Sequence, residues 1–260
     1  MRVESTMTEQ RKNLIRKLLK GIETGDPAAV AVVDEKKYIQ HNPQTHEGSE
    51  GLAALFARLA KSKPRVNIVR AFADGDFVFA HTEYDFSTRR IGFEVFRFEE
   101  ERAVEHWDNI QPRKGPGPSS RSMVDGPTEA TDLSQTEENR RIVQDFVQEV
   151  LIERRLDRLS VYIDGEQFAQ HSPELADGSA ALKASLEAKS ADGPIVSYQK
   201  THRILAEGSF VLSVSEGLRA GAHSAFYDLY RLSKGKLVEH WDTIEAVAPQ
   251  AEWKNQNGKF

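Results

Sequence analysis

Two short segments of the sequence each place a histidine two residues before an aspartate. Residues 104–110 read Val-Glu-His-Trp-Asp-Asn-Ile, and residues 238–244 read Val-Glu-His-Trp-Asp-Thr-Ile. Both alternate as a β-strand does, so the histidine and aspartate share one face with a valine and an isoleucine. An imidazole and a carboxylate on such an inward face can take up and return protons near neutral pH. The candidate groups for this acid–base chemistry are His106, Asp108, His240 and Asp242.

A further carboxylate is expected beside each pair. Glu94 lies in the preceding predicted strand, on the face of Phe96, and a turn near Arg102 makes the two strands antiparallel neighbours. Asp228 holds the matching place before the second segment. A partly apolar cavity raises the pKa of a carboxylate or holds an imidazole near neutrality. We therefore predict two catalytic groups: Glu94 with His106 and Asp108, and Asp228 with His240 and Asp242. A structural alternative stays open, because a His-x-Asp unit is often a hydrogen-bonded pair that holds the end of a sheet.

His41 and His171 are two more catalytic candidates. They lie in the segments Gln-His-Asn-Pro and Gln-His-Ser-Pro, where predicted helices give way to strands. Each could polarise a substrate carbonyl or relay a proton to the aspartate. Alternatively, each holds a turn through its ring nitrogens.

The neighbouring strands supply the residues predicted to contact a substrate. His81 and Glu83 share a face of the second strand with Phe79. The second half has Val214 in place of His81 and keeps Glu216 for Glu83, which suggests one active and one structural pocket. The predicted binding residues are His81, Glu83, Phe79, Phe96, Glu216 and Tyr230. Trp107 and Trp241 point to the opposite face from the histidines, where packing is the expected role.

The hydrophobic pattern places helices before strands, twice. Apolar residues recur every three or four positions in the predicted helices and every second position in the predicted strands. The helices are predicted at 8–23, 28–33, 49–61, 137–153 and 179–189, with a further short helix before residue 168. The strands are predicted at 65–73, 77–87, 90–98, 103–111, 195–205, 210–217, 224–232 and 236–244. This order indicates an α+β fold with helices on one face of a curved, mainly antiparallel sheet.

The chain also repeats itself outside the two His-x-Asp segments. Tyr-Ile-Gln-His-Asn-Pro at 38–43 matches Phe-Ala-Gln-His-Ser-Pro at 168–173, and Glu-Val-Phe-Arg-Phe at 94–98 matches Asp-Leu-Tyr-Arg-Leu at 228–232. A period near 130 residues suits a duplicated globular domain rather than a solenoid. We expect domains at 1–111 and 136–260, joined by a Pro/Gly/Ser-rich linker at 112–135.

These motifs and their order resemble the SnoaL-like polyketide cyclases, in the aldol-condensation-catalysing branch of the NTF2-like superfamily. The resemblance implies two tandem cone-shaped domains, each with a strongly curved sheet around a pocket. It also implies that the last-strand aspartates, Asp108 and Asp242, move the proton without a cofactor. Such domains commonly pair through their sheets, so an intrachain pseudo-dimer is expected, with higher oligomers open.

Composition limits the other possibilities. The 260 residues carry a net charge of −5, with acids and bases interspersed, so nucleic acid is not an expected partner. The absence of cysteine removes thiolate chemistry and Cys-bound metals. Pro43 interrupts the nearest metal-like pair, His41 and His46, and no Gly-rich phosphate loop occurs, so neither metal nor cofactor is expected. Without a long apolar run or a signal-peptide pattern, we expect a cytoplasmic protein that does not bind membranes.

Our leading hypothesis is a cofactor-free enzyme that condenses or cyclises a small, apolar or polyketide-like carbonyl compound. A pocket carboxylate would remove the proton next to a carbonyl, and His41 or His106, or their counterparts, would stabilise the oxygen. One alternative is a non-enzymatic binding or assembly module, whose His and carboxylate groups would be fully paired. An isomerase or dehydratase on the same scaffold is another.

Overall fold

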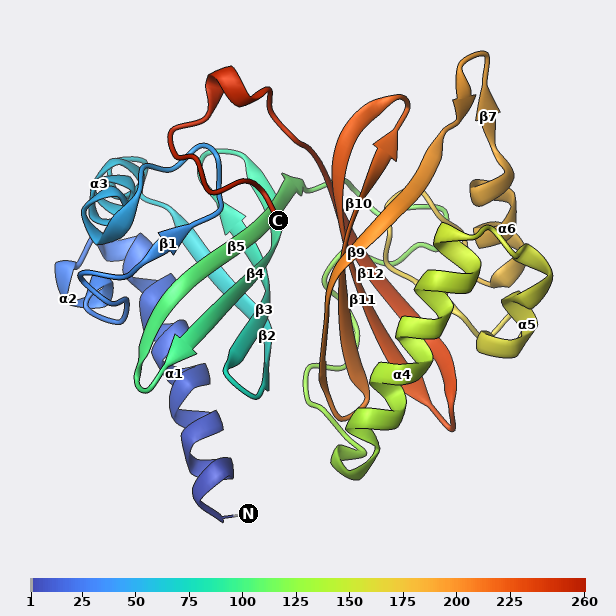
Figure 1. The fold of residues 1–260 in the computed structure, drawn as a ribbon, viewed down its shortest axis with the longest axis horizontal. Coiled ribbons are helices and arrows are strands. Elements are labelled where there is room, and N and C mark those ends of the chain that lie inside the picture. Colours follow the sequence, from blue (N-terminus) through green and yellow to red (C-terminus); the bar gives the residue numbers. More distant parts are fainter. Residues whose placement is uncertain (1) are drawn as a thin grey trace. The chain divides into compact units, whose positions relative to one another are not determined.

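The computed structural model describes residues 2–260, with side chains from Thr6 onward, and the chain divides into two compact units (Figure 1). Unit 1 holds the chain up to Pro112 together with Ala248–Phe260, and unit 2 is Arg113–Val247. The division differs from the expected one at both connecting segments. Residues 248–260, expected in the second domain, contact unit 1, where the Lys254 amide donates to the Pro43 carbonyl. Residues 113–132, expected to be a spacer, pack in unit 2, where the Asp125 carbonyl accepts from Trp241 Nε1.

Unit 1 is an α+β domain with one five-stranded mixed sheet. Its helices are α1 (Arg2–Thr24), α2 (Pro27–Val30) and α3 (Gly48–Ala60). Its strands are β1 (Ile39–Gln40), β2 (Arg65–Asp74), β3 (Phe77–Asp85), β4 (Arg89–Glu99) and β5 (Arg102–Pro112). The sheet order is β1-β5-β4-β3-β2, with β1 parallel to β5 and the remaining pairs antiparallel.

Unit 2 repeats this arrangement, and three of its strands are longer than their counterparts in unit 1. Its helices are α4 (Thr136–Phe146), continued by the π-helical turn η2 (Val147–Ile152), α5 (Leu159–Tyr162) and α6 (Ser179–Glu187), with 3₁₀ turns η1 (Leu133–Gln135) and η3 (Leu156–Arg158). Its main strands are β6 (Ala169–Gln170), β9 (Val196–Glu207), β10 (Phe210–Arg219), β11 (Ala222–Ser233) and β12 (Lys236–Ala246). The order β6-β12-β11-β10-β9 is that of unit 1, which confirms the duplicated α+β fold. The remaining elements are the hairpin β7 (Lys189–Ser190) and β8 (Gly193–Pro194) and the 3₁₀ turn η4 (Gln250–Glu252), which lies in unit 1.

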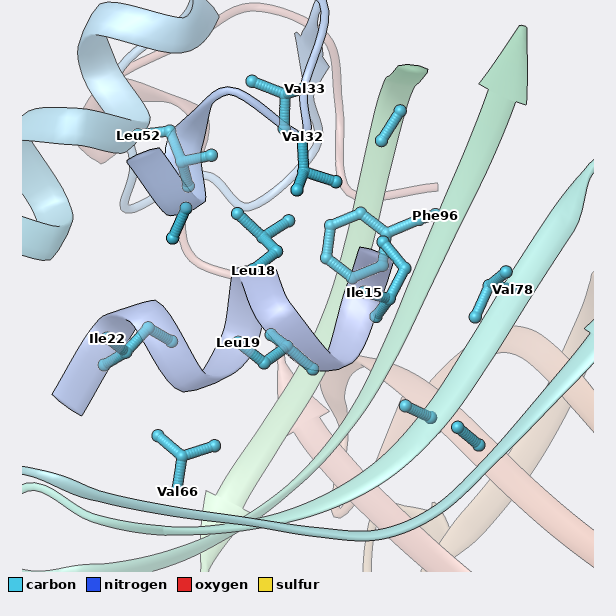
Figure 2. Close-up of a cluster of buried hydrophobic side chains, with 14 of the residues drawn as sticks. Ile15, Leu18, Leu19, Ile22, Val32, Val33, Leu52, Val66, Val78 and Phe96 are labelled. Carbon is cyan, nitrogen blue, oxygen red and sulfur yellow. The ribbon is translucent and has the colours of Figure 1, made fainter. Parts of the chain in front are cut away.

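In unit 1 the core lies between α1 and one face of the sheet, as Figure 2 shows. The apolar stripe of α1 recurs at helical spacing and turns toward Val66, Val78 and Phe96 on the strands. The stripe consists of Ile15, Leu18, Leu19 and Ile22. Register shifts between Ile68 and Arg70, and between Arg97 and Phe98, mark β-bulges, which bend strands. The face of the sheet that packs on α1 also carries the candidate site.

The short strands β1 and β6 are the main elements that the hydrophobic pattern does not predict, because two residues carry no period. None of the helices in the described part of the chain is long and apolar enough to cross a membrane.

Candidate active sites

The strand register in both units brings the predicted acid–base groups together. In unit 1, Glu94 on β4 pairs with Asp108 on β5, and Phe96 pairs with His106. In unit 2, Asp228 on β11 pairs with Asp242 on β12, and Tyr230 pairs with His240. Directly paired residues lie on the same face of a sheet. Each unit therefore presents one histidine and two carboxylates on its helix-covered face.

In unit 1, His106 and Glu94 form a buried pair. The Nε2 atom of His106 lies 2.7 Å from Oε2 of Glu94, and the hydroxyl of Tyr84 donates to Oε1 of Glu94 at 2.6 Å. Burial raises the pKa of Glu94, although the hydrogen bond and charge of His106 oppose this. Burial and the nearby Glu94 charge hold the pKa of Tyr84 well above its ordinary value, so its hydroxyl stays a donor. The second imidazole nitrogen, Nδ1, lies 2.8 Å from Oε1 of Gln40.

Asp108, the second carboxylate of unit 1, is also paired at both oxygens. The side-chain amide of Asn42 donates to Oδ2 at 2.6 Å, and the ammonium of Lys259 lies 3.4 Å from Oδ1. Lys259 is only 3% exposed, so this ion pair is buried. A groove of about 480 Å³ lies nearby beside Lys20, Arg65 and Tyr84, but neither Glu94, His106 nor Asp108 lines it. Each carboxylate oxygen and each imidazole nitrogen of the unit 1 cluster thus has a protein partner.

In unit 2, His240 is held in the same way. Its Nε2 lies 2.9 Å from Oδ1 of Asp228, and its Nδ1 lies 2.8 Å from Oε1 of Gln170. The hydroxyl of Tyr198 lies 3.2 and 3.1 Å from the two oxygens of Asp228. Tyr198 comes from β9 whereas Tyr84 comes from β3, so the two units reach the same contact from different strands.

Asp242 distinguishes the two sites. It matches Asp108 in register, yet its Oδ1 has no hydrogen-bond partner among the described residues, although the side chain is only 8% exposed. Burial raises the pKa of Asp242 to about 6, against the charge of His240 and a hydrogen bond from Ser172, while the charge of Asp228 adds to the rise. A carboxyl group with this pKa can both accept and donate a proton near neutral pH.

The structure places His41 and His171 away from these clusters. The Nε2 atom of His41 lies 2.9 Å from Oε1 of Glu105, and its ring stacks on Trp107 at 4.6 Å. His171 makes the matching contacts with Glu239, at 2.8 Å, and with the ring of Trp241. Because Trp107 pairs with Val95 rather than Glu94, this stack lies on the opposite face of the sheet. On that face, each histidine bonds a glutamate and stacks on a tryptophan. Neither histidine contacts Asp108 or Asp242, contrary to the prediction.

Four of the predicted binding residues also lie on the opposite face. His81 pairs with Phe93, whereas Ala80 pairs with Glu94, so the strand period turns His81 away from the cluster together with Phe79 and Glu83. Glu216 pairs with Ala225 and accepts from His202 and His223 at 2.8 Å each. The other two predicted binding residues do line the clusters. Phe96 stacks on His106 at 4.5 Å, and Tyr230 stacks on His240 at 4.9 Å.

Several residues of the clusters were missed from the sequence. They are Gln40, Asn42, Tyr84 and Lys259 in unit 1, and Gln170, Ser172 and Tyr198 in unit 2. The sequence does carry a signal for four of them, namely Gln40, Asn42, Gln170 and Ser172. The extended segments around His41 and His171 alternate, so the residues on either side of each histidine share the other face.

The donor sets of the two clusters resemble those of metal sites. Each cluster brings one imidazole nitrogen and two carboxylates within 4.8 Å of one another. In unit 1, however, Nε2 of His106 already bonds Glu94, and Lys259 already supplies a positive charge to Asp108. In unit 2, Nε2 of His240 is likewise directed at Asp228. The residues present therefore fit an internal proton-sharing network better than a metal centre.

Comparison with known proteins identifies the fold. Residues 15–106, which span α1 to β5, match the family model of the SnoaL-like domain. Unit 1 is a SnoaL-like domain. Unit 2 has the strand order of this SnoaL-like domain and the same cluster on its last strand, so we describe it as a second copy. A search of curated proteins finds no significant match.

Solved structures are similar to a single SnoaL-like unit. TsrD from Streptomyces laurentii is 19% identical over 40% of this chain and 89% of TsrD, with a TM-score of 0.36. An LEH-like epoxide hydrolase from M. tuberculosis is 19% identical over 40% of this chain and 84% of its own, also with a TM-score of 0.36. An NTF2-like protein from Cytophaga hutchinsonii is 17% identical over 39% and 90%, with a TM-score of 0.34.

Proposed function

We propose that unit 2 carries a cofactor-free acid–base site in which Asp242 moves a proton next to a substrate carbonyl. The observation that carries this proposal is the state of Asp242. Its carboxylate is buried, one of its oxygens lacks a protein hydrogen bond among the described residues, and its pKa is raised to about 6. A carboxylate with this pKa can accept and return a proton near neutral pH, and its vacant oxygen can receive the proton from a substrate.

His240 and Asp228 give this base its electrostatic setting. Asp228 holds the imidazole through Nε2 and Tyr198 completes the hydrogen bonds of Asp228. When the imidazole is protonated, its charge lies on the same face as Asp242 and stabilises the negative oxygen of an enolate. Tyr230 stacks on the imidazole ring of His240 and makes this surface partly apolar. These features support a small, apolar carbonyl compound as the substrate.

The reaction class follows from the first step. Removal of a proton beside a carbonyl gives an enolate, which can attack a second carbonyl in an aldol condensation or cyclisation. This is the chemistry that the SnoaL-like resemblance implies, and a polyketide-like substrate with two carbonyls would suit it. Isomerisation and dehydration begin with the same proton transfer, so the products formed from a β-diketone distinguish the three reactions.

Unit 1 supports a second candidate function, that of a non-catalytic binding or assembly module. Every oxygen of Glu94 and Asp108 and both nitrogens of His106 contact a protein partner. A carboxylate whose oxygens are already held by donors or a cation is a poorer proton acceptor than one with a vacant oxygen. We therefore assign the proton transfer to unit 2 and a structural role to the cluster of unit 1.

Two matched variants test the proposal. Exchange of α-protons is followed by ¹H NMR in D₂O with a panel of aryl ketones and β-diketones as probes. Asp242→Asn should abolish catalysed exchange, because an amide cannot accept the proton. The control is Asp108→Asn with Lys259→Met, which removes the matching carboxylate and its cation together, and it should keep the wild-type rate. Catalysed exchange that persists in Asp242→Asn would remove Asp242 from the mechanism.

A further inference from the structure

Each unit is completed by a segment that follows the last strand of the other unit's fold. Residues 248–260 follow β12 yet pack in unit 1, and residues 113–132 follow β5 yet pack in unit 2. In each segment, one backbone carbonyl bonds the histidine that follows the short parallel strand of the unit, β1 in unit 1 and β6 in unit 2. In unit 1, Nδ1 of His41 donates to the Gly258 carbonyl at 2.9 Å, and in unit 2, Nδ1 of His171 donates to the Ser122 carbonyl at 2.8 Å.

This shared anchor aligns Gly258 of one segment with Ser122 of the other. The residue after Gly258 is Lys259, and the residue after Ser122 is Met123. Both are buried, at 3% and 2% exposure. Lysine and methionine have unbranched side chains of similar length, and they differ chiefly in the charge at the end. The matched position thus holds a cation in unit 1 and a neutral thioether in unit 2.

The difference in charge matters because of what the lysine contacts. Its ammonium lies 3.4 Å from Oδ1 of Asp108, so the two opposite charges form an ion pair. Asp242 in unit 2 faces His240, Asp228 and Glu174, and its only cationic neighbour in that group is the imidazole. An adjacent ammonium favours the ionised form of a carboxylate and occupies one of its lone pairs, which makes it a poor base.

We propose that the ion pair between Lys259 and Asp108, which we call the charge lock, prevents proton transfer at the acid–base site of unit 1. The residue at this matched position, Lys259 or Met123, then decides which of the two sites can transfer a proton. The lock rests on the proposed function for its effect on activity, but not for its effect on the carboxylate. On this view unit 1 is a latent catalytic site that lacks only a neutral residue at position 259.

The test exchanges the two residues. The ionisation of Asp242 is followed by ¹³C NMR of its carboxyl carbon in wild type and in Met123→Lys. Met123→Lys should lower the pKa of Asp242 from about 6 by about 1 to 3 units, because an ammonium beside a carboxylate favours its ionised form. Lys254→Met, at an exposed position in the segment of Lys259, is the control for the activity measurement and should restore no exchange when it is combined with Asp242→Asn.

Activity is measured on the same proteins with the α-proton exchange probes. Lys259→Met combined with Asp242→Asn should regain catalysed exchange that Asp242→Asn alone has lost. An unchanged pKa of Asp242 in Met123→Lys would overturn the lock, and so would a lack of regained exchange in the Lys259→Met/Asp242→Asn variant when wild type is active. A lowered pKa of Asp242 in Met123→Lys together with no exchange in wild type would instead count against the proposed function and leave the effect of charge at the matched position established. If Lys259→Met does not fold, Met123→Lys decides alone, because an unchanged pKa of Asp242 contradicts the lock.

Discussion

The carboxamide oxygen of Gln40 determines which nitrogen of His106 carries a proton. This Oε1 atom lies 2.8 Å from Nδ1 of His106 and accepts the backbone N–H of Asn42 at 2.9 Å. A backbone N–H can only donate, so the atom facing both groups is the oxygen, and Nδ1 must be protonated. The other nitrogen, Nε2, faces Glu94 at 2.7 Å, and this contact requires one proton as well. His106 and Glu94 therefore share a single proton in either of its two positions.

This relationship predicts the tautomer of the buried imidazole. ¹⁵N NMR should show Nδ1 of His106 as a protonated nitrogen throughout the pH range in which the protein is folded. The Gln40→Leu variant should lose this preference, because leucine offers no acceptor to Nδ1. His46 is exposed and serves as the control. A signal from wild-type His106 with Nδ1 unprotonated would contradict the assignment.

Matching aspartates should have opposite effects on stability when they are replaced by asparagine. The folded-state pKa of Asp242, about 6, lies above its ordinary value of 3.8. A raised carboxyl pKa stabilises the fold fully below the unfolded value, and this contribution is lost as pH rises through the folded value. At pH 8 the ionised Asp242 thus costs about 3 kcal/mol relative to pH 3. Asp242→Asn should recover much of this at pH 8 and should lose its advantage near pH 4.

Asp108→Asn should destabilise unit 1 instead. It leaves the buried ammonium of Lys259 without its carboxylate, which costs about 3 to 5 kcal/mol for a buried ion pair broken on one side. Hydrogen exchange of peptides from β4–β5 and from β11–β12, measured by mass spectrometry, reports on the two units separately. Stabilisation by Asp108→Asn, or destabilisation by Asp242→Asn at pH 8, would show that the two carboxylates do not differ as the contacts indicate.

The two tyrosine hydroxyls should differ in strength. Tyr84 donates to Glu94 at 2.6 Å, whereas Tyr198 divides its hydroxyl between two oxygens of Asp228 at 3.2 and 3.1 Å. Short hydrogen bonds to charged groups are the stronger ones. Tyr84→Phe should therefore cost about 1.5 to 3 kcal/mol, and Tyr198→Phe about 1 kcal/mol. Equal losses of exchange protection in β4 and β11 would count against this ranking.

The alternation of the strands was enough to predict the centre of each site. A two-residue period assigns Glu94, His106 and Asp108 to one face, and the turn near Arg102 makes their strands neighbours. The same period applied to residues 40–42 places Gln40 and Asn42 on one face of the chain and His41 on the other. Gln40 pairs with His106 through a two-residue parallel strand, so Gln40 and not His41 faces the cluster.

Lys259 and Tyr198 could not be predicted in this way. Lys259 reaches Asp108 from a segment 151 residues further along the chain, and no periodic pattern links that segment to unit 1. Tyr198 lies on β9, whereas the repeat would assign its role to the strand of Tyr84. Such contacts depend on tertiary packing, which a repeated motif does not specify.

The anchoring histidine of unit 2 provides the last prediction. His171 bonds Glu239 at 2.8 Å and the Ser122 carbonyl at 2.8 Å, and although burial favours a neutral Glu239, the hydrogen bonds of His171 and Arg231 lower its pKa. His171→Phe keeps an aromatic ring on Trp241 but removes both hydrogen bonds, at a cost of about 2 to 4 kcal/mol. Segment 113–132 should then open more often, and trypsin should cleave it at least about tenfold faster, since each 1.4 kcal/mol changes the open population tenfold.

The control for this experiment is His223→Phe, a change of the same kind in unit 2. The His223 side chain is 48% exposed and bonds Glu216. Cleavage after Arg113, Lys114 and Arg121 should match wild type in this variant, because the contact between His171 and Ser122 is intact. Equal cleavage rates in the His171 and His223 variants would mean that other contacts, such as that of Trp241 with Asp125, hold the segment in place.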